Sequence, residues 1–174
     1  MLRRALPVLL IVAASLGCAD QAAPTAVDLT ETVAEGETQI VLQELPGPTA
    51  GTLTYVVRVI ARWEGVASYR GEVSFAPGAF ELLGTKTPVG ADGEMFLVNP
   101  QPAAGRLLFS ALTTERFSTD EVLRFTVRPL VALRETKLTA SLGVVGDVGG
   151  TAVDARRVRS ADGIRDVKGR LLVR

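Results

Sequence analysis

Apolar and polar residues alternate along most of the chain after residue 36, and this period of two constrains the fold more than any other feature. Such alternation is typical of a β-strand with one buried face. In residues 68–75, Tyr69, Val73 and Phe75 share one face and polar side chains share the other. The expected strands span residues 38–42, 53–60, 68–75, 80–83, 95–98, 105–112, 122–128, 138–144 and 171–173.

Turn residues separate these segments, and no convincing amphipathic helix interrupts them. Pro46-Gly47-Pro48, Ala76-Pro77-Gly78 and Asn99-Pro100 are each expected to end a strand, while 114–120 is a polar loop with at most a helical turn. About nine short strands of this kind predict an all-β fold, an antiparallel β-sandwich or jelly roll. The expected core holds Tyr55, Val57, Val59, Tyr69, Val73, Phe75, Phe109, Leu123, Phe125, Val127, Leu138 and Leu142.

The N-terminus has the pattern of an export signal. Arg3 and Arg4 precede an apolar run, 5–16, that is shorter than the roughly 20 residues a membrane-spanning helix needs. The run leads into Ser15-Leu16-Gly17-Cys18, which resembles the lipobox of bacterial lipoproteins. The resemblance implies that Cys18 becomes a lipidated N-terminus and, in a cell with two membranes, that the protein reaches the outer membrane. The alternative is an ordinary signal peptide cut near Ala22, with Cys18 lost.

The chain is therefore expected to have three parts. Residues 1–17 are the signal peptide, and 18–36 are the lipidated cysteine and a polar, flexible linker without aromatic residues. Residues 37–174 form one β-sandwich domain, since no second boundary or internal repeat is visible.

Composition excludes several classes of function. The chain contains no histidine, which removes the commonest general base, the usual nitrogen ligand of zinc and the Ser-His-Asp triad. Its single cysteine allows neither an intrachain disulfide nor a CxxC site. Lys plus Arg and Asp plus Glu number 19 each, so there is no basic excess for nucleic acid. We expect a protein that is not an enzyme, holds no cofactor or metal and binds no nucleic acid.

The acidic residues do not form a recognisable site. An EF-hand-type calcium loop that started at Asp147 would need oxygen ligands where Gly149 and Val158 stand, so this segment is not predicted to be one. A calcium site built from separate loops stays open. The acids near the C-terminus are interpreted as solvated loop residues: Asp147, Asp154, Asp162 and Asp166. No pattern sets two carboxylates across a cleft for glycosidase chemistry among Glu64, Glu72, Glu81, Asp92 and Glu94.

Six segments follow one another in a distinctive order and spacing: residues 57–61, 66–83, 105–112, 123–128, 161–163 and 169–173. Taken together, they resemble the cohesin domain. Within the second, Phe75-Ala76-Pro77 stands where the family often has Tyr-Asp-Pro. The resemblance implies a jelly-roll sandwich, a plan that cohesins share with several carbohydrate-binding modules. It also implies a non-catalytic module that docks a protein partner, a dockerin in cellulosomes, on one sheet face.

Two neighbouring strands supply the candidate partner-binding face. If the apolar row of each strand points inward, the outward row is Ser68, Arg70, Glu72, Ser74, Arg106, Leu108, Ser110 and Leu112. A surface that mixes leucines with charged side chains suits a protein interface. With the opposite parity, Leu108 and Leu112 would instead lie under a loop.

Trp63, the only tryptophan, falls in a predicted turn. Its side chain is either a plug over one end of the sandwich or an exposed ring that stacks on a sugar. The small basic group Arg156, Arg157 and Arg159 is interpreted as a solvated loop.

Three hypotheses follow. The first is an envelope-anchored, cohesin-like module that binds a protein partner such as a dockerin. The second is a carbohydrate-binding module that holds polysaccharide. The low aromatic content of 5% argues against a flat platform for binding cellulose. The third is a structural envelope lipoprotein without a soluble ligand.

Overall fold

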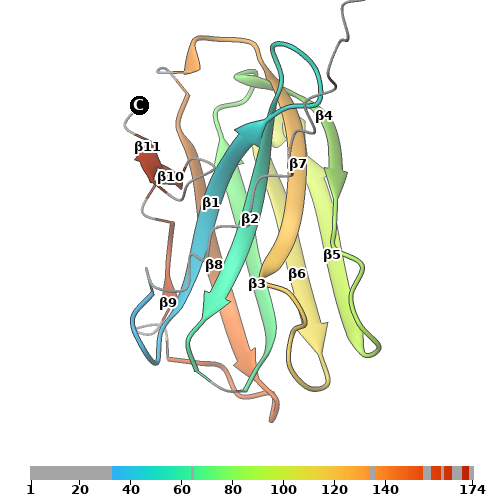
Figure 1. Ribbon diagram of the computed structural model, residues 1–174, viewed down its shortest axis with the longest axis vertical. Helices are drawn as coiled ribbons and strands as arrows, with labels where there is room; N and C mark the ends of the chain where they lie inside the picture. Colours follow the sequence, from blue (N-terminus) through green and yellow to red (C-terminus); the bar gives the residue numbers. More distant parts are fainter. Residues whose placement is uncertain are drawn as a thin grey trace, which may run out of the picture.

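Two β-sheets pack face to face in the computed structural model, as Figure 1 shows. The structure describes residues 33–63, 65–133, 136–154, 158–161, 163–165 and 170–172. Within this part of the chain, eight strands have seven to ten residues and three have two. The all-β sandwich predicted from the alternation is confirmed.

The first sheet, called sheet A here, has the strand order β11-β10-β1-β2-β7-β4, and β9 also pairs with β1. Its long strands are antiparallel, whereas β9 and β10 pair with β1 in parallel. In Figure 1 the short C-terminal strands lie along the β1 side of the sandwich. The bounds are β1 (Thr38–Pro46), β2 (Leu53–Ala61), β4 (Phe80–Lys86), β7 (Glu121–Pro129), β9 (Val158–Arg159), β10 (Ile164–Arg165) and β11 (Leu171–Leu172).

The second sheet, sheet B, has the order β5-β6-β3-β8 and is antiparallel throughout. β3 is central to it, because it pairs with both β6 and β8. A short 3-10 helix, η2 (Pro102–Ala104), connects β5 to β6. The strand bounds are β3 (Val66–Phe75), β5 (Glu94–Gln101), β6 (Arg106–Thr113) and β8 (Leu138–Asp147).

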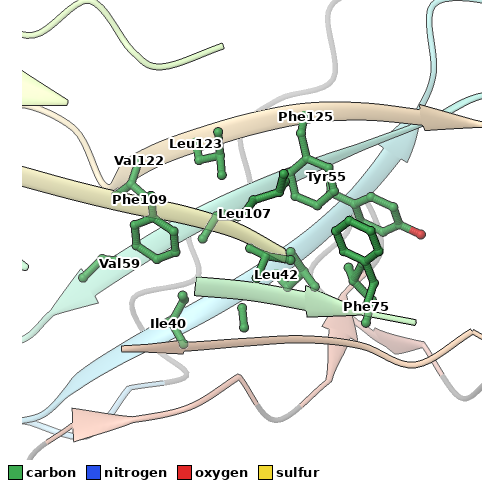
Figure 2. Packing of buried hydrophobic residues seen from close by; sticks show 14 of the residues in the cluster. Ile40, Leu42, Tyr55, Val59, Phe75, Leu107, Phe109, Val122, Leu123 and Phe125 are labelled. Atoms are coloured by element: carbon green, nitrogen blue, oxygen red, sulfur yellow. The ribbon is translucent and has the colours of Figure 1, made fainter. Parts of the chain in front are cut away.

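The inward rows of both sheets form one core, part of which is drawn in Figure 2. At one end, Tyr55 stacks on Phe125 with ring centroids 5.3 Å apart, and Phe80 meets the edges of both Tyr55 and Phe75. Gly71 leaves room for the ring of Phe109, because a Cβ there would lie 2.5 Å from its Cζ atom. All twelve predicted core residues belong to this cluster, Leu142 as a partly buried member.

Two bulges change which side chains point inward. The β3–β8 register shifts between Arg70 and Gly71, so Val145 is buried and Val144 is exposed, although a strict alternation from the predicted core residue Leu142 would turn Val144 inward. The β2–β7 register also shifts, between Val57 and Arg58, and Val122 joins the core although the alternation assigned it to the opposite row. An extra residue in one strand reverses the alternation from that point on, which a strict period of two does not capture.

Other differences concern strand ends. β4 continues through Lys86, beyond the expected strand 80–83, and β5 continues through Asn99 and Pro100 instead of stopping there. β5 is the edge strand of sheet B. A proline is tolerated there because no further strand pairs with β5 and needs the N–H donor that proline lacks. Residues 114–120 form a loop without a helical turn. On the outer side of sheet A, Val33 packs with Val41 and Ile60 in a second small cluster.

The core position Leu107 and the exposed position Leu112 lie on the same strand, β6, and make a matched pair. Leu107 has no exposed surface, so Leu107→Ala should lower the free energy of unfolding by about 2–5 kcal/mol through lost burial and a cavity. Leu112→Ala should change it by less than about 1 kcal/mol. Urea titrations of both variants measure the two values, and equal effects would contradict the assigned strand parity.

Candidate binding face

The eight residues predicted for the partner-binding face lie together on the outer side of sheet B. The β3–β6 register pairs them as Ser68 with Leu112, Arg70 with Ser110, Glu72 with Leu108 and Ser74 with Arg106. The intervening residues Leu107, Phe109 and Ala111 are buried. Of the two parities that the sequence left open, the structure therefore has the one that turns Leu108 and Leu112 outward. That a partner binds these residues stays a prediction.

Neighbouring strands add apolar side chains that the sequence analysis did not include. Met95 pairs with Leu112, and Leu97 pairs with Ser110, across the β5–β6 register. Val144 of β8 pairs with Arg70 of β3. The exposed fractions are 49% for Met95, 54% for Leu97, 46% for Leu112 and 54% for Val144. We call these four side chains the apolar patch.

The apolar patch surrounds a shallow hollow of about 310 Å³. Ser68, Arg70 and Ser110 also line it, so hydroxyl groups and one guanidinium lie among the apolar side chains. The hollow therefore offers both apolar area and a few fixed polar groups, the combination found at the centres of protein interfaces.

Charged groups on this face differ in how far they are already paired. Glu72 accepts a hydrogen bond of 2.8 Å from the hydroxyl of Ser74, and Arg106 donates one of 2.7 Å to Gln101. The salt bridges found among the described residues all involve sheet A or the loop beside it, and none includes Arg70. The exposed Arg70 guanidinium is thus available to a carboxylate of a partner.

Trp63 lies at one end of the sandwich, after β2 and before β3. Its side chain is partly buried and packs against the main core, and its indole N–H donates a 2.8 Å hydrogen bond to the hydroxyl of Thr38. This is the arrangement that the plug interpretation predicted. Stacking of the ring on a sugar stays a separate prediction.

The loop 114–120 is tied to the edge of sheet B through Glu94. The Glu94 carboxylate accepts hydrogen bonds from the backbone N–H and the hydroxyl of Ser118 and from the N–H of Ala91. Desolvation acts in the opposite direction, but these hydrogen bonds together hold the pKa of Glu94 below its usual value. Phe117 of the same loop contacts the rings of Tyr69 and Phe96, with centroids 4.8 and 5.9 Å away.

Most of the other acids have local roles. Asp147 accepts a hydrogen bond from the N–H of Thr151 in the turn after β8, and Asp154 is exposed. Glu81 pairs with Arg128 across β4 and β7. No group of three potential metal ligands occurs in the part of the chain that the structure describes. Glu64, Asp162, Asp166, Arg156 and Arg157 lie outside the described residues.

The predicted signal peptide, Cys18 and the linker up to residue 32 also lie outside the described residues. None of the helices in the described ranges is sufficiently long and apolar to cross a membrane.

The Tyr69 hydroxyl gives a test of the packing beneath the loop 114–120. The residue is only 4% exposed, and its hydroxyl has no hydrogen-bond partner among the described residues. Burial, reinforced by the negative charges of Glu94 and Asp120, raises the pKa of Tyr69 above its usual value. Tyr69→Phe should therefore leave the free energy of unfolding at neutral pH unchanged or raise it by about 1 kcal/mol.

The same shift predicts a pH dependence. Above about pH 10 a tyrosine in the unfolded chain ionises, whereas the folded Tyr69 stays protonated, so stability falls as the pH rises. Wild-type protein should lose stability above this pH faster than Tyr69→Phe, since Tyr55, the only other tyrosine, is present in both. Thermal melts from pH 8 to 11 measure the difference, and parallel curves would rule out the assigned environment.

Comparison with known proteins identifies the fold. No family model matches the sequence, and no curated protein matches it. Solved structures do match, and several of them are cohesin modules. A non-cellulosomal cohesin from Archaeoglobus fulgidus is 16% identical with a TM-score of 0.50, over 72% of this chain and 88% of that one.

Two further matches come from complexes. The sixth cohesin of scaffoldin B from Acetivibrio cellulolyticus, solved with a Cel5 dockerin, is 18% identical, with a TM-score of 0.52 over 74% of this chain and 98% of that one. A type I cohesin–dockerin complex from Clostridium thermocellum gives 12% identity and a TM-score of 0.52, over 75% and 99%. The domain thus has the cohesin-like jelly-roll fold that the sequence resemblance implied.

Proposed function

We propose that this chain is a non-catalytic, envelope-anchored module that binds a protein partner through the outer face of sheet B. The observation that carries the proposal is the apolar patch around Arg70, exposed on a sheet whose other face is fully used by the core. The complexes of similar folds are with dockerins, which supports a dockerin-like partner over a small molecule.

The chemistry of this face defines the partner surface. Met95, Leu97, Leu112 and Val144 would be buried against apolar side chains, and each such contact contributes in proportion to the area removed from water. Arg70 would pair with a carboxylate of the partner at the centre of the contact. Ser68 and Ser110, which line the hollow, would set orientation through hydrogen bonds to the partner.

Anchoring belongs to the same proposal. Acyl chains on Cys18 would add about 0.8 kcal/mol for each buried methylene, and two or more chains hold a protein stably on a membrane. The linker 18–36 would then reach on the order of 25 Å from the bilayer as a flexible chain. The domain could meet a partner beside the membrane, which we place at the outer membrane in a cell with two membranes.

Binding is tested by comparing variants of the outer face with a control on sheet A. Leu97→Asp and Leu112→Asp place a charge in the apolar patch and should each weaken binding to a dockerin panel, or to a partner recovered from the source cells, at least about 30-fold. The control variant Leu83→Asp, at a position on β4 that is 42% exposed, should leave the binding affinity unchanged. Calorimetry measures the affinities.

Charge reversal at Arg70 tests the proposed ion pair. Arg70→Glu should weaken binding at the same face and reverse its salt dependence, because added salt screens an attraction in the natural chain and a repulsion in the variant. Unchanged affinity in Arg70→Glu and in both aspartate variants would reject this face. Absence of any protein partner would favour the structural envelope role instead.

Anchoring is tested at the cysteine. Cys18→Ser should abolish metabolic labelling with palmitate and shift the exported protein from the membrane fraction to the soluble fraction. The natural chain should carry the label and start at Cys18 after processing. An unlabelled natural chain that starts near Ala23 would support the ordinary signal peptide and refute the lipid anchor.

A further inference from the structure

A second concave site lies at the end of the sandwich that Trp63 covers, and it shares the lining residue Tyr69 with the hollow in the apolar patch. It has a volume of about 890 Å³ and lies between the segment after β2 and the loop 114–120. Its lining includes Arg62, Trp63, Glu115, Arg116, Phe117 and Asp120. We call this site the end cavity.

Two aromatic side chains give the end cavity apolar walls. The indole N–H of Trp63 is already bonded to Thr38, so the part of the ring left for a ligand is its apolar surface. Phe117 is held against Tyr69 and Phe96, and its loop is fixed by the hydrogen bonds of Glu94. Both rings are partly buried and lie in supported positions before a ligand arrives.

The polar groups around these rings supply both donors and acceptors. Arg62 and Arg116 are exposed cations, and Arg62 is oriented by a 3.1 Å hydrogen bond from Nη1 to the carbonyl oxygen of Val33. Glu115 is an exposed acid, while Asp120 is held by Arg58 at 2.6 Å and keeps its second oxygen for other donors. Because the lining mixes these cations with the acids Glu35, Glu115 and Asp120, the site does not favour a phosphate or another strongly charged ligand.

We propose that the end cavity binds a saccharide, with one sugar ring against Trp63 and its hydroxyl groups bonded to Arg116, Glu115 and Asp120. A sugar ring has an apolar C–H face for an aromatic side chain and hydroxyl groups that both donate and accept hydrogen bonds. The arrangement of the end cavity matches both properties. This inference is independent of the proposed protein-binding face.

Trp63 makes the test direct, since it is the only tryptophan in the sequence. Intrinsic fluorescence of the full domain therefore reports on the end cavity alone. The probes are cellohexaose, xylohexaose, mannohexaose, laminarihexaose and chitohexaose. We expect at least one of them to shift the emission in a saturable manner and to protect Trp63 from acrylamide quenching. No shift and no heat of binding with any of the five would overturn the proposal.

Variants then locate the binding. Trp63→Ala and Arg116→Ala should each weaken the saccharide affinity measured by calorimetry on the order of tenfold. Leu97→Asp on the apolar patch should leave it unchanged while weakening the protein partner. If Trp63→Ala fails to fold, the exposed Arg116→Ala and the milder Phe117→Leu carry the test. Saccharide binding that resists all end-cavity variants would refute the assigned site.

Discussion

Everything in this structure depends on the packing of two sheets through their alternating inward rows. The single cysteine allows no intrachain disulfide, and the described residues hold no cluster of metal ligands, so apolar burial has to offset the conformational entropy of the described domain. The stacked pair Tyr55 and Phe125 fills one end of the core, where Phe80 packs edge-to-face with both Tyr55 and Phe75. Since inward and outward rows are fixed together, the core also determines which side chains reach the surface.

β3 connects the core to the candidate binding face. Its inward Tyr69, Val73 and Phe75 are buried, so its outward residues must lie on the outer face of sheet B. The bulge opposite Arg70 also shapes the candidate binding face, because it turns Val144 outward beside that arginine. A strictly regular β8 would have kept Val144 in the core and left Arg70 without an apolar neighbour on that side. The irregularity thus places Val144 in the apolar patch and brings Val145 into the core in its stead.

Much of this arrangement was predictable from the sequence, for an identifiable reason. In β3 and β6 the apolar and polar residues alternate without a bulge between the two strands, so both the core row and the outward row follow from the period of two. The bulges at Val122 and Val144 were not predictable, because valine is equally acceptable on either face. Met95 and Leu97 were missed because an edge strand with exposed apolar residues has no polar row to mark its outer side. The end cavity joins loops far apart in the sequence, and only Trp63 signalled it.

The charge pattern of the domain supports different ligands for its two concave surfaces. Around the apolar patch, Glu72 and Arg106 are satisfied locally, which leaves Arg70 as a single directed charge suited to one carboxylate in a desolvated contact. The end cavity is lined by charges of both signs, and Asp120 is already paired with Arg58. A ligand there would therefore be held by directional hydrogen bonds more than by attraction to a net charge. Both surfaces use Tyr69 as a supporting residue, through its backbone in β3 and through its ring against Phe117. Apart from Tyr69 the two surfaces are lined by different residues, so we expect both ligands to bind at the same time without competing.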